Sequence, residues 1–134
     1  MSFRKFLPFI LMGLIAIDSS LALIGFFFPH LWFAVQHGDS HYIDTQGLLI
    51  HLAYFWAIYA LLQFVGLLFW KKNPSLWLNV FITIRIVDIF LIASYIYSDS
   101  LLLPLAKIVL YEVIPANLCL TWFFWKCQRR ILAS

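Results

Sequence analysis

The sequence predicts an all-α fold, a polytopic integral membrane protein in which four transmembrane helices form a bundle. The 134 residues are 64% hydrophobic and 11% charged, which is about half the charge content of a typical soluble domain. Aromatic residues make up 19% of the chain, whereas disordered chains are polar and poor in aromatics. We therefore expect residues 1–134 to form a single transmembrane domain, because no segment outside the apolar stretches is long enough for a core of its own.

Four apolar stretches reach the length of about 20 residues that a helix needs to cross the hydrocarbon core. They are Phe6–Phe28, Leu48–Trp70, Leu76–Tyr97 and Leu101–Trp125. The first is interpreted as a retained helix rather than a signal peptide, because its apolar run exceeds about 15 residues and contains an aspartate. The long outer loop, residues 29–47, lies between the first and second helices.

The expected helix ends carry residues that favour starts and stops. Asp44 precedes the second helix, Asn73 with Pro74 precedes the third, and Asp99 precedes the fourth. Aspartate and asparagine side chains accept hydrogen bonds from the free N–H groups of a first turn, and proline is tolerated there. Pro115 lies inside the fourth stretch, where it is expected to kink the helix.

Cationic residues gather on one side of the predicted topology. They are Arg4, Lys5, Lys71, Lys72, Lys126, Arg129 and Arg130. By the positive-inside rule both termini are predicted to face the cytoplasm, in a bacterial inner membrane or an equivalent one. The formal net charge of +3 comes from these loop and terminal positions rather than from a basic face. The lipid bilayer is thus an expected partner and nucleic acid is not.

Five ionisable residues interrupt the apolar stretches. They are Asp18, Arg85, Asp88, Lys107 and Glu112. A charged side chain at the bilayer centre costs about 3 kcal/mol or more, so each is expected to face protein, water or another charge. At a rise of about 1.5 Å per residue, all but Lys107 fall near one level. The sequence therefore predicts a charge network close to the membrane midplane.

Two helix faces are expected to surround this network. Arg85 and Asp88 are three residues apart and share a face with apolar and aromatic residues: Phe81, Ile92 and Tyr95. The second helix has no charge, but aromatic, polar and small residues recur at helical spacing: Trp56, Tyr59, Gln63 and Gly66. These groups supply hydrogen bonds and allow close helix approach.

The sum of the five charges leaves one carboxylate without a cation. A buried unpaired charge is costly, so either one carboxyl is protonated or a cation, proton or ligand group occupies the site. The candidate residues of a ligand-binding site or charge network are Asp18, Arg85, Asp88, Lys107, Glu112, Gln63, Tyr59 and Trp56.

The outer loop and the start of the second helix carry all four histidines of the chain. His37, His41 and His51 are weak candidates for zinc or copper ligands. No metal site is predicted, because Gly38 makes a shared helical turn for His37 and His41 doubtful. Residues 29–36 are apolar enough for a short interfacial helix over the outer mouth of the bundle.

No phosphate-binding glycine loop, nucleophile elbow or HExxH motif occurs in the sequence, and no cofactor is identified. Binding of an amphipathic small molecule, lipid or partner subunit within the bundle agrees best with a buried charge network. One alternative is an enzyme that acts on a lipid-like or isoprenoid substrate by carboxyl general acid/base catalysis. Another is a proton- or cation-coupled transporter. The buried charges can also fix helix register, or hold a homo-oligomer or a larger membrane complex together.

Overall fold

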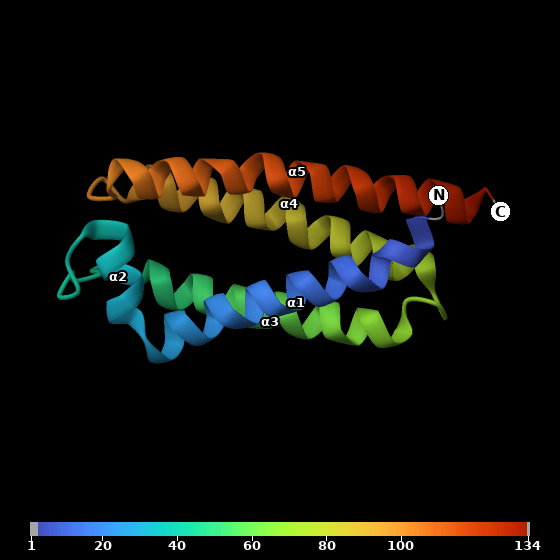
Figure 1. The fold of residues 1–134 in the computed structure, drawn as a ribbon, viewed down its shortest axis with the longest axis horizontal. Coiled ribbons are helices and arrows are strands. Elements are labelled where there is room, and N and C mark those ends of the chain that lie inside the picture. The colour runs from blue at the N-terminus through green and yellow to red at the C-terminus, as the bar shows by residue number, and fades with distance from the viewer. Residues whose placement is uncertain (1–2, 134) are drawn as a thin grey trace.

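The computed structural model describes residues 3–133, which fold into helices and connecting loops (Figure 1). The helices are α1 Phe3–Phe27, α2 Pro29–His37, α3 Leu48–Phe69, α4 Pro74–Ser98 and α5 Pro104–Leu132. All except α2 are long and apolar enough to cross a membrane. The prediction of an all-α chain with four helices long and apolar enough to span a membrane is confirmed.

The long helices pack as two pairs. α1 lies along α3, and α4 lies along α5, with fewer contacts between the pairs (Figure 1). Both termini lie at the same end of the bundle, which we call the terminal end. The pairs converge there and diverge toward the opposite end, where α2 is inserted between them. We call this opposite end the α2 end.

The terminal end is packed by apolar side chains from all four long helices. The cluster contains Leu7, Leu11, Leu14, Trp70, Leu78, Phe81, Phe124 and Cys127, and Leu67 of α3 packs against it. The rings of Phe81 and Phe124 lie 5.5 Å apart between centroids. A Cβ atom at Gly66 would lie only 2.4 Å from the Phe81 ring. Glycine is thus the residue that lets α3 approach α4 this closely.

A second small-residue contact joins α1 to α3. A Cβ atom at Gly25 would lie 2.7 Å from the Ala53 side chain. Lipid tails are as apolar as the side chains, so helices in a membrane associate through close packing rather than through the hydrophobic effect. The Gly25–Ala53 contact therefore holds the first pair together near the α2 end.

The helix starts differ in part from those expected. Asn73 Oδ1 accepts a hydrogen bond from the Leu76 N–H at 3.2 Å, as predicted for a cap. Asp44 Oδ2 accepts from the Leu49 N–H at 2.8 Å, although Gly47, in a left-handed conformation, directly precedes α3. Asp99 does not cap the last helix, which begins at Pro104 rather than at residue 101.

The delayed start of α5 has a structural cause. The backbone N–H of Leu103 donates to the carbonyl of Gln36 in α2 at 2.9 Å, which holds residues 99–103 as a loop. Pro104 then occupies the first helical position, where its missing N–H costs nothing. α5 continues through Pro115 to Leu132, so the interior proline does not end the helix.

Candidate functional site

Asp18 of α1 is the centre of a buried polar network between the two helix pairs. Its Oδ2 accepts hydrogen bonds from Arg85 Nη2 at 2.9 Å and from Gln63 Nε2 at 2.6 Å. Asp18, Arg85 and Gln63 are 3%, 4% and 1% exposed, respectively. The ion pair thus joins α1 to α4, and the amide brings in α3. The amide gives the buried carboxylate a second hydrogen-bond donor, which reduces the cost of burying the ion pair.

Asn117 extends the network to α5. Its Oδ1 accepts from Arg85 Nη1 at 3.3 Å, and its Nδ2 donates to Asp88 Oδ2 at 2.7 Å. Arg85 and Asp88 of one helix are thus linked through an amide on its neighbour. All four long helices contribute a side chain to one continuous set of hydrogen bonds, which fixes their relative register.

Two further predicted residues lie around the network. The Arg85 guanidinium lies over the Tyr59 ring, 5.8 Å from its centroid, a distance compatible with a cation–π contact. Gln63 Nε2 also donates to the Tyr59 carbonyl at 2.9 Å. Trp56 is buried about one turn before Tyr59 in α3. The predicted inner faces of α3 and α4 are therefore the faces that meet.

A cleft of about 440 Å³ opens beside the network. α3 and α4 form its floor with Leu52, Trp56, Arg85 and Asp88, all of them buried. Its mouth lies between α1 and α5 and carries exposed side chains: Ile17, Val109, Glu112 and Ala116. Ile17 and Ala116 fall near the middle of their apolar spans, Glu112 lies about a third of the way along its span, and Val109 lies nearer the start. The mouth therefore opens on the side of the bundle, between the ends of the apolar spans.

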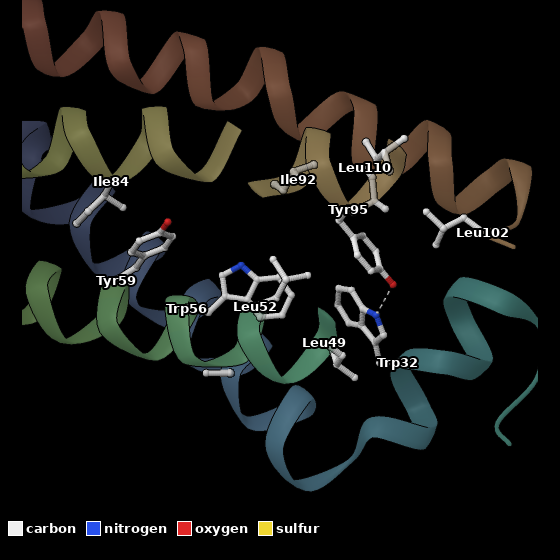
Figure 2. Close-up of a cluster of buried hydrophobic side chains, with 12 residues drawn as sticks. Trp32, Leu49, Leu52, Trp56, Tyr59, Ile84, Ile92, Tyr95, Leu102 and Leu110 are labelled. Atoms are coloured by element: carbon white, nitrogen blue, oxygen red, sulfur yellow. Dashed lines mark hydrogen bonds between the residues drawn. The ribbon is translucent and has the colours of Figure 1, made fainter. Parts of the chain in front are cut away.

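Aromatic side chains close the cleft toward the α2 end. Trp32 of α2 lies 5.3 Å from the Trp56 ring, and its Nε1 donates to the Tyr95 hydroxyl at 3.2 Å (Figure 2). Gln36, on the next turn of α2, also lines the cleft, and its Oε1 is buried without a partner among the described residues. The expected short helix over the outer mouth thus exists and forms one wall of the cleft.

The structure does not bring Lys107 and Glu112 into the network. Glu112 is exposed at the mouth of the cleft, and Lys107 is half-buried nearer the start of α5. Within residues 3–133 neither side chain has an ion pair or hydrogen bond. The reason is helical phase, because the inward face of α5 passes through other positions: Ala106, Leu110, Asn117, Phe124 and Cys127.

Asn117 was missed because the sequence analysis followed formal charges. The signal was present in the spacing of the last helix. Residues 106, 110, 113, 117, 120, 124 and 127 are all buried or half-buried, and they follow the alternating three- and four-residue steps of a helix–helix seam. A polar residue on that seam is expected to find a partner in the bundle.

A second polar cluster lies at the α2 end, around Asp99. Its Oδ2 accepts from His37 Nε2 at 2.7 Å, and its Oδ1 accepts from the Leu101 N–H at 3.1 Å and the Tyr42 hydroxyl at 3.4 Å. The His37 and Tyr42 rings are stacked, 3.8 Å apart. Burial and the neighbouring Asp99 carboxylate raise the pKa of Tyr42. Asp99 thus fastens α2 and the outer loop to the α4–α5 connection.

The weak metal candidates are dispersed in the structure. Gly38 is left-handed and ends α2, so His41 does not follow His37 on a helical turn. His51 Nδ1 lies 2.6 Å from the Gly47 carbonyl, and His37 faces Asp99. In the described range no group of three or more His, Cys, Asp or Glu side chains is arranged to hold a metal ion.

No model of a known protein family matches the chain, and no curated protein or solved structure is significantly similar to it. The chemistry of the cleft and of the buried network is therefore the basis for the function proposed below.

Proposed function

We propose that this chain is an integral membrane protein that binds an amphipathic small molecule in the cleft between α1 and α5. The observation that carries the proposal is the composition of the cleft. Apolar and aromatic walls enclose about 440 Å³, within the range of about 300–1,000 Å³ typical of small-molecule sites. A few polar groups, Asp88 and Asn117 among them, converge at the floor. Such a site suits a ligand with an apolar body and one polar group.

The position of the mouth supports a ligand that comes from the bilayer. Ile17 and Glu112 lie at the mouth, each well inside an apolar span. At the α2 end the cleft is closed by Trp32 and Gln36. A lipid is one such ligand. We further propose the orientation favoured by the cationic residues, with the terminal end toward the cytoplasm.

The proposal is tested by blocking the cleft. Ala116 lies exposed at the mouth, whereas Ala93 is exposed on α4 away from it. The wild-type chain, Ala116→Trp and Ala93→Trp are reconstituted in nanodiscs and analysed by native mass spectrometry. We expect wild type and Ala93→Trp to retain a species of defined mass that Ala116→Trp loses.

Three outcomes would contradict the proposal. A species retained equally by all three proteins binds outside the cleft. A second polypeptide lost from Ala116→Trp would make the cleft a subunit interface. Chemical conversion of the retained molecule by the purified wild-type chain would indicate a membrane enzyme instead.

A further inference from the structure

The cleft holds an excess of negative groups. Its ionisable lining residues are Asp18, Asp88, Glu112 and, as the one cation among the described lining residues, Arg85. The Arg85 guanidinium already donates to Asp18 through Nη2 and to Asn117 through Nη1. It is therefore committed to the network. The two carboxyls without a cation of their own are Asp88 and Glu112.

Asp88 has an acceptor that the protein does not use. Its Oδ2 accepts from Asn117, but its Oδ1 is buried and has no hydrogen-bond partner within the described chain. The residue is 4% exposed and lines the cleft. A buried carboxylate oxygen without a donor destabilises the fold, because it has lost its hydrogen bonds to water. A ligand that brings a donor to Asp88 would remove that cost.

Glu112 also lacks a partner, although it is exposed rather than buried. It is exposed on α5 between Val109 and Ala116 at the mouth, and no described residue pairs with it. A carboxylate that faces hydrocarbon is expensive unless it meets a cation or a proton. Glu112 lies eight residues from the start of α5, and Asp88 ten residues from the end of α4. At about 1.5 Å per residue they differ in depth by only about 3 Å.

We propose that the ligand of this cleft is a cationic amphiphile, with a protonated amine or a similar nitrogen group held between Asp88 and Glu112. The nitrogen would donate to Asp88 and neutralise Glu112, while the apolar body lies along Trp56 and Ile92, with Trp32 at its far end. Anionic amphiphiles are excluded, since they would face two carboxylates and an arginine that is already paired. This assignment rests on the proposed function and adds the charge class of the ligand.

The test uses three probes with the same chain and different head groups: dodecylammonium, dodecanol and dodecanoate. An equimolar mixture is equilibrated with the protein in zwitterionic nanodiscs, and retained probes are counted by native mass spectrometry. The wild-type chain is expected to retain dodecylammonium about tenfold more than either other probe, as one charge-assisted hydrogen bond provides. Ala116→Trp should lose this retention, and Ala93→Trp should keep it.

Charge-neutral variants then test which carboxylates cause the preference for dodecylammonium. Glu112→Gln and Asp88→Asn should each reduce the retention of dodecylammonium relative to dodecanol about tenfold. Asp39→Asn, in the exposed outer loop, is the matched control and should behave as wild type. Glu112→Gln changes an exposed side chain, so its result does not depend on the buried network remaining folded.

The outcomes separate this inference from the proposed function. Equal retention of the three probes, or a preference for dodecanoate that Ala116→Trp abolishes, would overturn the cationic assignment and leave the cleft as a binding site. An ammonium preference that survives both Glu112→Gln and Asp88→Asn would also overturn it. If Ala116→Trp changes the retention of none of the three probes, both proposals are wrong.

Discussion

Both ends of the bundle hold an apolar cluster, and the α2 end adds the hydrogen bonds of Asp99. At the terminal end, side chains such as Phe81 and Phe124 interlock at 1% and 0% exposure. At the α2 end the two helix pairs diverge, and Asp99 links α2 and the outer loop to the α4–α5 connection. Apolar packing requires close approach, whereas a few directed hydrogen bonds can bridge helices that stay apart. The cleft lies between the two apolar clusters and is lined by members of both, Leu14 from one and Trp32 from the other.

The largest expected effect comes from breaking the apolar cluster of the terminal end. Phe124→Ala removes a fully buried ring from the cluster shared by all four long helices, and we expect it to lower the free energy of unfolding by about 3–5 kcal/mol. Unfolding in increasing mole fractions of SDS measures this change. Phe90, 69% exposed on α4, is the matched control. An equal loss for Phe90→Ala would show that the terminal end is not packed as described.

A smaller effect is expected from weakening the hydrogen bonds of Asp99 at the α2 end. Asp99→Asn removes the charge that accepts from His37 and Tyr42, and should cost about 1–2 kcal/mol. The change should be local, with faster amide hydrogen exchange in residues 29–37 and unchanged exchange near Phe124. Asp39→Asn is the control, because Asp39 lies exposed in the same loop and accepts only from the His41 N–H among the bonds described. If amide exchange becomes equally faster in residues 29–37 and near Phe124, the two ends of the bundle do not open independently.

The smallest effect concerns Tyr42. Its hydroxyl contact with Asp99 is long, at 3.4 Å, so Tyr42→Phe should change stability by less than about 1 kcal/mol. The pKa of Tyr42 is raised above its ordinary value of 10.0, so the neutral phenol is favoured by the fold. That contribution is complete below pH 10.0 and is lost as the pH rises through the raised pKa.

Hydrogen exchange in α2, measured as a function of pH after correction for the intrinsic rate, checks this prediction. Protection in the wild-type chain should fall in the alkaline range, and protection in Tyr42→Phe should fall less. Parallel curves for the two proteins would show that titration of Tyr42 has no part in holding α2.

Hydropathy and helical spacing were sufficient for the spanning helices and for two inner faces. Runs of about 20 apolar residues have few stable forms other than a helix in a bilayer, so the four spans were predictable. The faces of Trp56 with Gln63 and of Arg85 with Asp88 were predictable because α3 carries no Asp, Glu, Lys or Arg and the two charged residues of α4 lie on one face. Both pairs are buried in the structure.

The inward face of α5 could not be predicted in the same way. It carries polar residues on more than one face, so the charges of Lys107 and Glu112 pointed to one rotation and the apolar seam through Asn117 to another. In the structure, α5 packs against α4 in the rotation that buries the apolar seam. The role of Asp99 was also beyond the sequence, because its contact with His37 joins positions 62 residues apart. The divergence of the helix pairs, and hence the cleft, depends on such long-range contacts.

Under the proposed function, the mouth between Ile17 and Glu112 also determines how occupancy of the cleft depends on its surroundings. A molecule that reaches this opening does so by diffusing within the plane of the bilayer. Its effective concentration is then its mole fraction among the lipids, rather than its amount in the aqueous phase. Diluting the protein in excess detergent would empty the cleft even for a tightly bound guest, while a nanodisc of fixed lipid number would keep it filled. Affinities for this protein are therefore best expressed per lipid, at a stated membrane composition.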